Sequence, residues 1–469
     1  MREAEQPLLA WQAEALESWR SQECRGIVQA VTGTGKTRIG IDAIKVAVSE
    51  GRRAAVLVPT IVLQAQWRAQ LVKVLPGSVR IGNLGGGAVP CTLDTHDVVV
   101  AVVNAAATTP LCTTSGHLLV ADECHRYAAP WFGRALREEF TERLGLTATL
   151  ERSDGEEILL KEYFGEVCFD IGYQRALADE VIAHYSVAMI GVPLTSTEKE
   201  RYDELSDKIA KAILTLATQY GLPTKPFHEF LRRVSEMAKD WSQPGSIEAT
   251  AFLKAVSARV ELIAGAQGKR EAVTKLAPAL KVAKRSLLFS QRITIAQELA
   301  SDLNKVGLVA EGTNGPSSME DVLGRFKQGK TNVLSAVKML DEGVDVPEVG
   351  FAVIVSASKT RRQMIQRMGR ILRRKGDDGL ARFAILYMQG TSEDPALGGH
   401  EGFLKEVKEH ADDYEEFSSE QLQQAVEFLA ITRPLKPPGA RRREGDSTRE
   451  QSTDESTDDD FDARTFYGL

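Results

Sequence analysis

The sequence has no apolar run long enough to cross a membrane. Its longest apolar stretches, such as Val98 to Val103 and Leu118 to Ala121, fall well short of the ~20 residues that a transmembrane helix needs. The N-terminus also lacks the apolar segment of a signal peptide. The 5 cysteines are an odd number without a C-x-x-C pair, which argues against a disulfide framework, a zinc ribbon or an iron–sulfur cluster. We therefore expect a cytoplasmic protein with reduced thiols and no membrane partner.

A strongly basic composition is absent as well, because the formal net charge is −7. The charge is unevenly distributed along the chain. The segment Asp446 to Leu469 carries 8 acidic residues against 2 arginines, so residues 1–445 sum to only about −1. Between Phe351 and Gly376 there are 8 lysines or arginines and no acidic residue. A local basic segment of this kind is compatible with a polyanionic partner such as nucleic acid.

A chain of 469 residues exceeds the size of a single hydrophobic core and is expected to fold as two or three domains. In two parts of the chain, short apolar runs alternate with helical patterns, which is typical of βαβ units around a parallel sheet. These runs lie at residues 26–30, 54–58, 98–103, 118–121 and 144–146, and again at residues 286–289, 333–337, 351–355 and 383–387. The sequence therefore predicts an α/β fold with two tandem parallel-sheet domains.

The chain between these two parts has a different pattern. Apolar residues such as Tyr202, Leu205 and Ile209 recur there at helical spacing, and Thr195 with Glu198 matches a capping box. After about residue 433 apolar residues are few, which predicts a disordered tail. The predicted organisation is a first α/β domain at 1–190, an all-helical insertion at 191–280, a second α/β domain at 281–392, a C-terminal helical extension at 393–433 and a disordered acidic C-terminal tail at 434–469.

The segment Ala30 to Thr37, AVTGTGKT, follows a predicted strand and precedes a helical stretch. Glycines let backbone N–H groups turn toward phosphates, and the helix N-terminus favours their negative charge. We expect Lys36 to reach the β and γ phosphates and the Thr37 hydroxyl to bind Mg²⁺. The candidate ATP-binding residues of this loop are Thr32, Gly33, Thr34, Gly35, Lys36 and Thr37. By itself the loop predicts only nucleoside triphosphate binding, because kinases, GTPases and motors share it.

Two adjacent acidic residues, Asp122 and Glu123, follow the buried-strand run that ends at Ala121. In open α/β sheets the carboxyl ends of the strands form the edge where ligands bind. We expect Asp122 to hold Mg²⁺ and Glu123 to orient and polarise the attacking water. His125 would lie beyond the phosphates. Taken alone, such a pair is more often a solvated loop, but its combination with the loop at Lys36 favours the catalytic interpretation.

Six motifs in order along residues 8 to 390 resemble those of superfamily 2 helicases. They are Leu8 to Leu16 with Gln12 (the adenine-contacting Q motif), Val56 to Thr60 with Leu63, Gln66 and Trp67 (motif Ia), Asp122 to His125 (motif II), Leu144 to Thr149 (motif III), Leu340 to Pro347 (motif V) and Gln366 to Arg373 (motif VI). The resemblance implies that ATP and Mg²⁺ bind between two RecA-like domains.

The same resemblance assigns further candidate site residues by motif position. Gly343, Asp345 and Gln366 would bind ATP together with Gln12, while His125, Thr147 and Thr149 would couple hydrolysis to movement; Pro59, Thr60, Gly86 and Arg152 are the candidate nucleic-acid contacts. Contacts of this kind go mainly to phosphates and should tolerate any sequence. The alternative is that the loops expected to contact phosphates are ordinary turns without a nucleic-acid contact.

The spacing of motif VI supports a role for its arginines at the ATP. If Arg361 to Arg374 forms a helix, Gln366, Arg370 and Arg373 share one face, well away from its apolar face. We expect Arg370 and Arg373 to stabilise the transition-state charge on the γ-phosphate, as arginine fingers do. For neighbours such as Arg361 and Arg374 we prefer a solvated basic surface.

Within the superfamily, the stretches LGLTATLERSDG, LDEGVDVPE and QRMGRILRR look most like the xeroderma pigmentosum group B (XPB) type of DNA helicase. That resemblance implies DNA as the track, 3′ to 5′ movement and a helical thumb, which the predicted insertion resembles in character. The sequence has Arg152-Ser153-Asp154 where longer relatives have Arg-Glu-Asp. A double-strand translocase that does not separate strands, and a nucleic-acid-binding platform switched by ATP, stay open as alternatives. A protein partner, for example a nuclease or a repair or defence component, also stays open.

Overall fold

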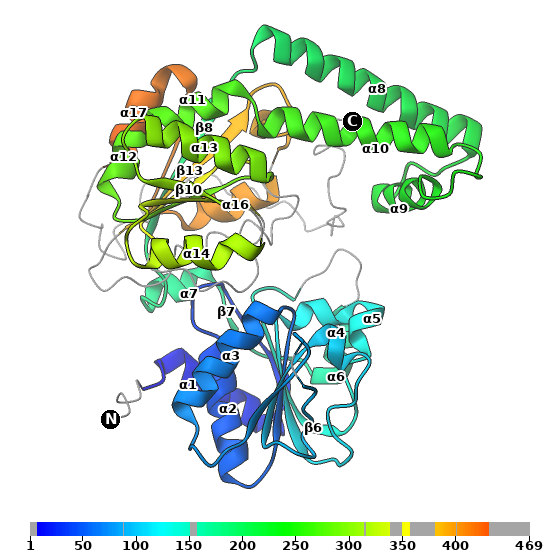
Figure 1. Cartoon of the computed structure of the whole chain (residues 1–469), viewed down its shortest axis with the longest axis vertical. Coiled ribbons are helices and arrows are strands. Elements are labelled where there is room, and N and C mark those ends of the chain that lie inside the picture. Colours follow the sequence, from blue (N-terminus) through cyan, green and yellow to red (C-terminus); the bar gives the residue numbers. More distant parts are fainter. Residues whose placement is uncertain are drawn as a thin grey trace, which may run out of the picture. The chain divides into compact units, whose positions relative to one another are not determined.

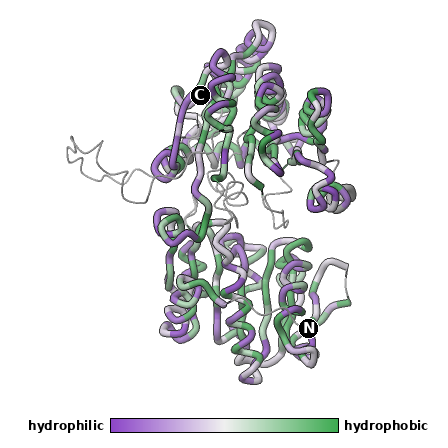
Figure 2. The backbone as a smooth tube through the Cα atoms, turned by 90° about the vertical axis from the view of Figure 1, so that its left-hand side faces the viewer, coloured by the Kyte–Doolittle hydropathy of each residue, from purple (hydrophilic) through white to green (hydrophobic). Residues whose placement is uncertain are grey.

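The computed structural model describes residues 7–87, 89–150, 157–313, 316–337, 349–356, 380–399 and 401–430. The chain divides into two compact units, of which the first runs to Ile182 and the second begins at Ala183 (Figure 1). Figure 2 shows apolar segments along the interior of each unit and helices whose residues alternate between apolar and polar. This is the pattern of amphipathic helices that cover a buried sheet.

The first unit is built on a seven-stranded parallel sheet with the strand order β3-β4-β2-β5-β6-β1-β7. Its strands are β1 (Arg25–Ala30), β2 (Ala54–Val58), β3 (Ile81–Leu84), β4 (Val98–Val102), β5 (His117–Asp122), β6 (Phe140–Thr147) and β7 (Val167–Ile171). The central strands are short runs of Val, Leu and Ala that are buried on both faces, as parallel strands usually are.

The helices of the first unit cover both faces of this sheet (Figure 1). They are α1 (Ala10–Ser21), α2 (Thr37–Ser49), α3 (Ile61–Val74), α4 (Val103–Ala106), the 3₁₀ helix η1 (Cys124–Ala128), α5 (Pro130–Gly133), α6 (Glu157–Phe164) and α7 (Tyr173–Ala178). On one face, Leu160 and Phe164 of α6 pack with strand residues such as Ile27 and Leu119 in a common core. Helix α2 follows β1 directly, so its N-terminus lies at the carboxyl end of that strand.

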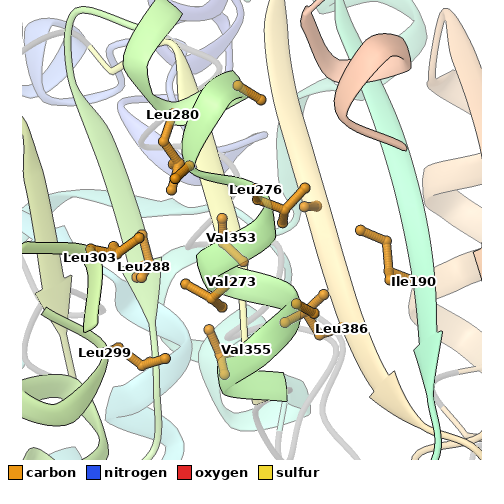
Figure 3. Packing of buried hydrophobic residues seen from close by; sticks show 14 of the residues in the cluster. Ile190, Val273, Leu276, Leu280, Leu288, Leu299, Leu303, Val353, Val355 and Leu386 are labelled. Carbon is orange, nitrogen blue, oxygen red and sulfur yellow. The ribbon is translucent and has the colours of Figure 1, made fainter. Parts of the chain in front are cut away.

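The second unit contains another seven-stranded parallel sheet, with the order β10-β11-β9-β12-β13-β8-β14. Its strands are β8 (Tyr185–Val192), β9 (Ser286–Phe289), β10 (Ala310–Gly312), β11 (Val333–Ala336), β12 (Phe351–Ile354), β13 (Ala381–Met388) and β14 (Asp413–Ser418). The helices against this sheet are α11 (Gln267–Lys275), α12 (Ala277–Val282), α13 (Ile293–Lys305), α14 (Pro316–Lys327), α16 (Glu401–His410) and α17 (Leu422–Ala430), with 3₁₀ turns η3 (Pro395–Leu397) and η4 (Ser419–Gln421). Figure 3 shows helix residues packed on Leu288, Val353 and Leu386 of the strands; they are Val273 of α11, Leu280 of α12, and Leu299 and Leu303 of α13.

A helical arm, defined here as residues 196–264, extends from the second sheet. It consists of α8 (Ser196–Tyr220), α9 (Phe227–Met237) and α10 (Ser246–Ala264), and α8 and α10 run side by side (Figure 1). The predicted capping box is present, because the Thr195 hydroxyl accepts from the Glu198 backbone and the Glu198 carboxylate accepts from the Thr195 backbone. The arm has its own core, which includes Ile209, Phe230 and Phe252.

The base of the arm is hydrogen-bonded to the loop that follows β13. The Tyr202 hydroxyl accepts from the backbone N–H of Ser392 at 3.2 Å. Lys269 Nζ, at the start of α11, donates to Glu393 Oε2 at 2.6 Å, and both side chains are buried. Buried charges are retained only when they are paired in this way. The Tyr202 contact therefore attaches the arm to the loop after β13, and the ion pair attaches α11 to the same loop.

The fold confirms the prediction of two parallel-sheet domains, with differences at their boundaries. The predicted boundary at residue 190 lies inside β8, which pairs with β13 and β14 and therefore belongs to the second sheet. The segment 393–433, predicted to be helical, contains the strand β14 between α16 and α17. The predicted tail at 434–469 lies outside the described residues. Among the helices that the structure does describe, none is long and apolar enough to span a bilayer.

Candidate active site

The loop between β1 and α2 is folded tightly on itself. Gly33 and Gly35 adopt φ values of +93° and +89°, a left-handed conformation that side-chain-bearing residues rarely adopt. Thr34 Oγ1 donates to the carbonyl oxygen of Val31 at 2.8 Å, and Lys36 Nζ donates to that of Ala30 at 2.7 Å. Thr37 is the first residue of α2, so its backbone N–H lies at the helix N-terminus. This geometry is that of a phosphate-binding loop.

The ammonium group of Lys36 is buried close to two carboxylates. Burial lowers its pKa, and the charges of Glu123 and Asp122 act in the opposite direction. The strand order β5-β6-β1 places these acidic residues two strands from the loop, at the same edge of the sheet. The structure therefore brings together the lysine and the acidic pair, which are far apart in sequence.

Gln12 connects the first helix to the phosphate-binding loop. Its Nε2 donates to the carbonyl oxygen of Gly35 at 3.3 Å, and its Oε1 accepts from the backbone N–H of Leu9 at 3.0 Å. The second bond closes a cap at the N-terminus of α1. The candidate adenine contact thus touches the loop that is expected to hold the phosphates.

Asp122 is a buried carboxylate whose two oxygens both accept hydrogen bonds. Trp67 Nε1 donates to Oδ2 at 2.8 Å, and the backbone N–H of Glu123 donates to Oδ1 at 3.1 Å. Burial and the neighbouring charge of Glu123 raise the pKa of Asp122 to about 6. The Tyr127 hydroxyl donates to the carbonyl oxygen of Asp122 at 2.7 Å. These contacts fix the position of the carboxylate.

Glu123 has a left-handed backbone conformation, with φ of +52°. Such strain in a residue other than glycine costs free energy and is found preferentially at functional sites. Its Oε2 is buried, lies 3.4 Å from His125 Nδ1 and has no hydrogen-bond donor in the part of the chain that the structure describes. This buried carboxylate oxygen therefore has an acceptor position that the described residues do not use.

The candidate coupling residues form a chain of contacts between β5 and β6. His125 Nδ1 lies 3.0 Å from Thr147 Oγ1, and the Thr147 hydroxyl donates to the carbonyl oxygen of Thr149 at 2.8 Å. His125 and Thr147 are both buried. Because Glu123 is also near His125, these three residues form a continuous series of contacts with the candidate catalytic carboxylate.

Two of the candidate nucleic-acid loops meet at the N-terminus of α3. Thr60 caps this helix, since its Oγ1 accepts from the backbone N–H of Leu63 at 3.3 Å. A Cβ at Gly86 would lie 3.0 Å from Gln64 Oε1 and 3.4 Å from Ile61 Cγ2, so the loop after β3 lies against α3. The structure thus brings Pro59 and Thr60 near Gly86. Arg152, Gly343, Asp345, Gln366, Arg370 and Arg373 lie outside the described residues.

The sequence did not predict that Trp67 binds Asp122. Trp67 was recognised only as part of motif Ia, and Tyr127 was not singled out at all. The sequence signal that could have found Trp67 is its place on the buried face of the helix after β2, because β2 pairs with β5. A buried indole needs a hydrogen-bond acceptor, and Asp122 at the end of β5 supplies one.

The residues at this edge suit a magnesium nucleotide. Mg²⁺ prefers oxygen ligands and is usually held by one or two carboxylates together with phosphate oxygens. Asp122 offers a carboxylate and Thr37 a hydroxyl, at the strand edge and the helix N-terminus respectively. Burial raises the pKa of Asp122, which means that the negative charge of its carboxylate is only partly compensated by the chain. A divalent cation beside the carboxylate would compensate that charge. The donor set therefore fits the cation.

Comparisons with known families agree with this site. Residues 5–152 match the family described as "Type III restriction enzyme, res subunit", and residues 268–375 match the family described as "Helicase conserved C-terminal domain". The first match spans the phosphate-binding loop and the acidic pair. The second covers much of the second sheet.

The chain is also similar to curated proteins from archaea and bacteria. It is 30% identical over 374 residues to "DNA 3'-5' translocase XPB2" of Sulfurisphaera tokodaii, and the match covers 79% of each chain. It is 25% identical to "DNA 3'-5' helicase XPB" of Kineococcus radiotolerans, with 85% of this chain and 63% of that protein covered. It is 24% identical to the protein of the same name from Mycobacterium tuberculosis, with 81% of this chain and 61% of that protein covered.

Solved structures with tandem RecA-like domains share the fold. One is Dbp5 of S. cerevisiae bound to RNA and ADP BeF3, with a TM-score of 0.57 and 12% identity, covering 90% of this chain and 93% of that one. Another is the Hef helicase domain of Pyrococcus furiosus, with a TM-score of 0.52 and 19% identity, covering 82% of this chain and 96% of that one. At such identities the likeness concerns the fold alone.

Proposed function

This chain belongs to the XPB-like branch of the superfamily 2 helicases, and from that premise we propose that it hydrolyses ATP to move along or unwind DNA in the 3′ to 5′ direction. The observation that carries the proposal is the proximity of Lys36 to Asp122 and Glu123 at one edge of the first sheet. A relative that covers 79% of both chains is named for 3′ to 5′ translocation on DNA. The family resemblance read from the motifs is thereby confirmed.

The geometry of the site supports the roles that we propose for its residues. Glu123, whose Oε2 has an acceptor position that the described residues do not use, polarises and orients the attacking water as a general base. Lys36 exchanges its contact with the Ala30 carbonyl for the β and γ phosphates of ATP. Asp122 and Thr37 would hold Mg²⁺, which supplies compensation of the charge that develops on the phosphates.

Motifs V and VI contribute the remaining proposed contacts. By their motif positions, Gly343, Asp345 and Gln366 bind ATP, while Arg370 and Arg373 stabilise the transition-state charge. The support for these roles is the order and spacing of motifs V and VI, together with the helicase family match at residues 268–375.

The track is proposed to be contacted through its phosphates. Pro59, Thr60, Gly86 and Arg152 are the proposed contacts, and phosphate contacts imply binding that tolerates any sequence and weakens steeply with salt. Repeated closure and release around ATP would convert these contacts into steps, with His125, Thr147 and Thr149 as coupling residues. DNA is favoured over RNA by the names of the XPB relatives.

The test is ATP hydrolysis by the wild-type protein and a Glu123→Gln variant. Each is assayed without nucleic acid and with single-stranded DNA, duplex DNA or RNA. We expect DNA to stimulate the wild type, and the variant to lose about 10²-fold or more in kcat because it lacks the general base. Hydrolysis that no nucleic acid affects would favour an ATP-switched binding platform instead.

A second experiment separates helicase from translocase. Strand displacement on duplexes with a 3′ or a 5′ single-stranded extension is compared with displacement of a third strand from an intact duplex. Unwinding only from the 3′ extension supports a 3′ to 5′ helicase. Third-strand displacement without unwinding supports a double-strand translocase, which is consistent with the altered Arg152-Ser153-Asp154 element.

A further inference from the structure

Trp67 makes a buried contact with the carboxylate that is expected to hold Mg²⁺. Its indole N–H donates to Asp122 Oδ2 at 2.8 Å, and the exposed fractions of the two side chains are 1% and 6%. Hydrogen bonds to a charged group inside a protein are stronger and shorter than those between neutral groups. The bond occupies one acceptor direction of Oδ2 and thereby fixes the orientation of the whole carboxylate.

The ring of Trp67 lies in a narrow space between two catalytic elements. A Cβ at Gly40 of α2 would come within 2.6 Å of Trp67 Cη2 and 2.9 Å of Val120 Cγ1, so no larger residue at position 40 leaves room for the indole. Helix α2 begins in the phosphate-binding loop, and β5, which contains Val120, ends at Asp122. The indole therefore sets the spacing between these elements as well as donating to the carboxylate.

The N-terminal turn of α3, which lies about one turn before Trp67, is attached to the loops proposed to contact nucleic acid. Thr60 caps the helix, and one turn later Gln64 Nε2 donates to the carbonyl oxygens of Leu84 at 3.0 Å and Val100 at 2.8 Å. The Gln64 side chain also lies against Gly86. Gln64 and Trp67 share the buried face of α3. One rigid helix thus connects these loops with the Asp122 carboxylate.

We propose that Trp67 is a positioning residue that holds Asp122 for the metal, and that α3 transmits the nucleic-acid contact to this carboxylate through Trp67. The second part rests on the proposed function, whereas the first part depends only on nucleotide and metal binding. Residues that orient a metal ligand through a hydrogen bond typically change metal affinity by about 10- to 100-fold when they are replaced.

The first experiment measures metal binding without catalysis. Trp67→Phe keeps a buried aromatic ring but removes the indole N–H that donates to Asp122. The matched control is Trp19→Phe, because Trp19 is also buried in the first unit and its Nε1 donates at 3.0 Å to a carbonyl oxygen, that of Arg143, away from the site. Mg²⁺ is titrated at a fixed concentration of a fluorescent ADP analogue, with no nucleic acid present.

We expect the Mg²⁺ midpoint of nucleotide binding to rise by about 10-fold in Trp67→Phe and to stay at the wild-type value in Trp19→Phe. The thermal unfolding temperatures of both variants show how much stability the protein loses when a buried indole hydrogen bond is removed. A Trp67→Phe midpoint equal to that of the wild type overturns the positioning role. If Trp67→Phe does not fold, Gly40→Ala, which displaces the ring without removing it, is expected to raise the midpoint and decides the question in the same way.

The second experiment measures coupling. At saturating Mg²⁺, the ratio of kcat with DNA to kcat without DNA is expected to fall by about 3-fold or more in Trp67→Phe relative to Trp19→Phe. An unchanged ratio overturns transmission through α3 but leaves the metal result intact. A wild-type protein that no nucleic acid stimulates overturns the proposed function, and with it the coupling, independently of the Mg²⁺ titration.

Discussion

His125 Nδ1 lies 3.0 Å from Thr147 Oγ1, which ties the motif after β5 to the end of β6. The single hydroxyl hydrogen of Thr147 is donated to the Thr149 carbonyl at 2.8 Å, so the hydroxyl oxygen must accept from His125. The hydrogen of the imidazole is therefore assigned to Nδ1 from the network. A histidine held in one tautomer beside Glu123 can report the state of the catalytic site to the following motif.

Thr147→Val should weaken coupling more than nucleotide binding. The valine fills nearly the same volume but removes the hydroxyl, which leaves His125 and the Thr149 carbonyl without this partner at a cost of about 1–3 kcal/mol in stability. We expect the affinity for ATP to be retained while DNA stimulation of kcat falls. Hydrolysis assays with and without DNA check this, and Thr147→Ser, which keeps the hydroxyl, should retain most of the stimulation.

Lys36→Met should strongly weaken nucleotide binding without loss of stability. Burial lowers the pKa of Lys36, and its Nζ donates to the Ala30 carbonyl oxygen, whereas Lys269 donates to a carboxylate, so the desolvation of the Lys36 ammonium is less well compensated in the nucleotide-free site. Methionine retains the length of the stem, so we expect a Tm equal to or above that of the wild type. Affinity for ATP should fall by about 100-fold or more because the phosphates lose a charged donor. A Tm that falls by several degrees would contradict this account.

The central strands could be predicted from sequence because they are continuous apolar runs. The strands that were not predicted include β3 and β7 at the two edges of the first sheet and β10 and β14 at those of the second. Edge strands are buried on fewer sides and carry polar residues; β14, for example, reads DYEEFS. β8 was missed for another reason, since its apolar run follows the first domain in sequence but pairs in the second sheet.

The phosphate-binding loop could be predicted because the residues that form it are local in sequence. A phosphate-binding loop needs its glycines, lysine and threonine within a few residues of one another, and the loop of Lys36 has them. The contact between Trp67 and Asp122 joins positions 55 residues apart and depends on the pairing of β2 with β5. A single sequence does not state which strands pair, so this contact could not be derived from it.

Gln12→Ala should raise the KM for ATP by about 10-fold and that for GTP much less. In the structure the Gln12 side chain both caps α1 and donates to the Gly35 carbonyl, so it is fixed at the loop before any base binds. A site built to hydrogen-bond a base discriminates against analogues that lack the matching groups. Steady-state kinetics with both nucleotides check the prediction. An equal increase for ATP and GTP would assign Gln12 to the loop rather than to adenine.

Arg370→Ala and Arg373→Ala should each lower kcat by about 10³-fold with little change in nucleotide affinity. Arginine fingers act on the charge of the transition state, and their removal typically costs this much. Both residues lie outside the described part of the structure, so the prediction comes from motif VI alone. The matched controls are Arg361→Ala and Arg374→Ala, which we expect to hydrolyse ATP within about 2-fold of the wild type. Equal effects at all four positions would indicate a general electrostatic role.

Lys269→Met should destabilise the second unit by about 3–5 kcal/mol, because it leaves Glu393 as a buried charge without its partner. The double variant Lys269→Met/Glu393→Gln removes both charges and keeps an acceptor for the backbone N–H of Met388, which donates to Glu393 at 3.2 Å. We expect it to recover more than half of the loss. Urea unfolding followed by circular dichroism checks both values. Lys199→Met serves as the control, since its pair with Asp203 is about half exposed and should contribute less than about 1 kcal/mol. A double variant no more stable than Lys269→Met would show that the contact between α11 and the loop after β13 requires the charges themselves.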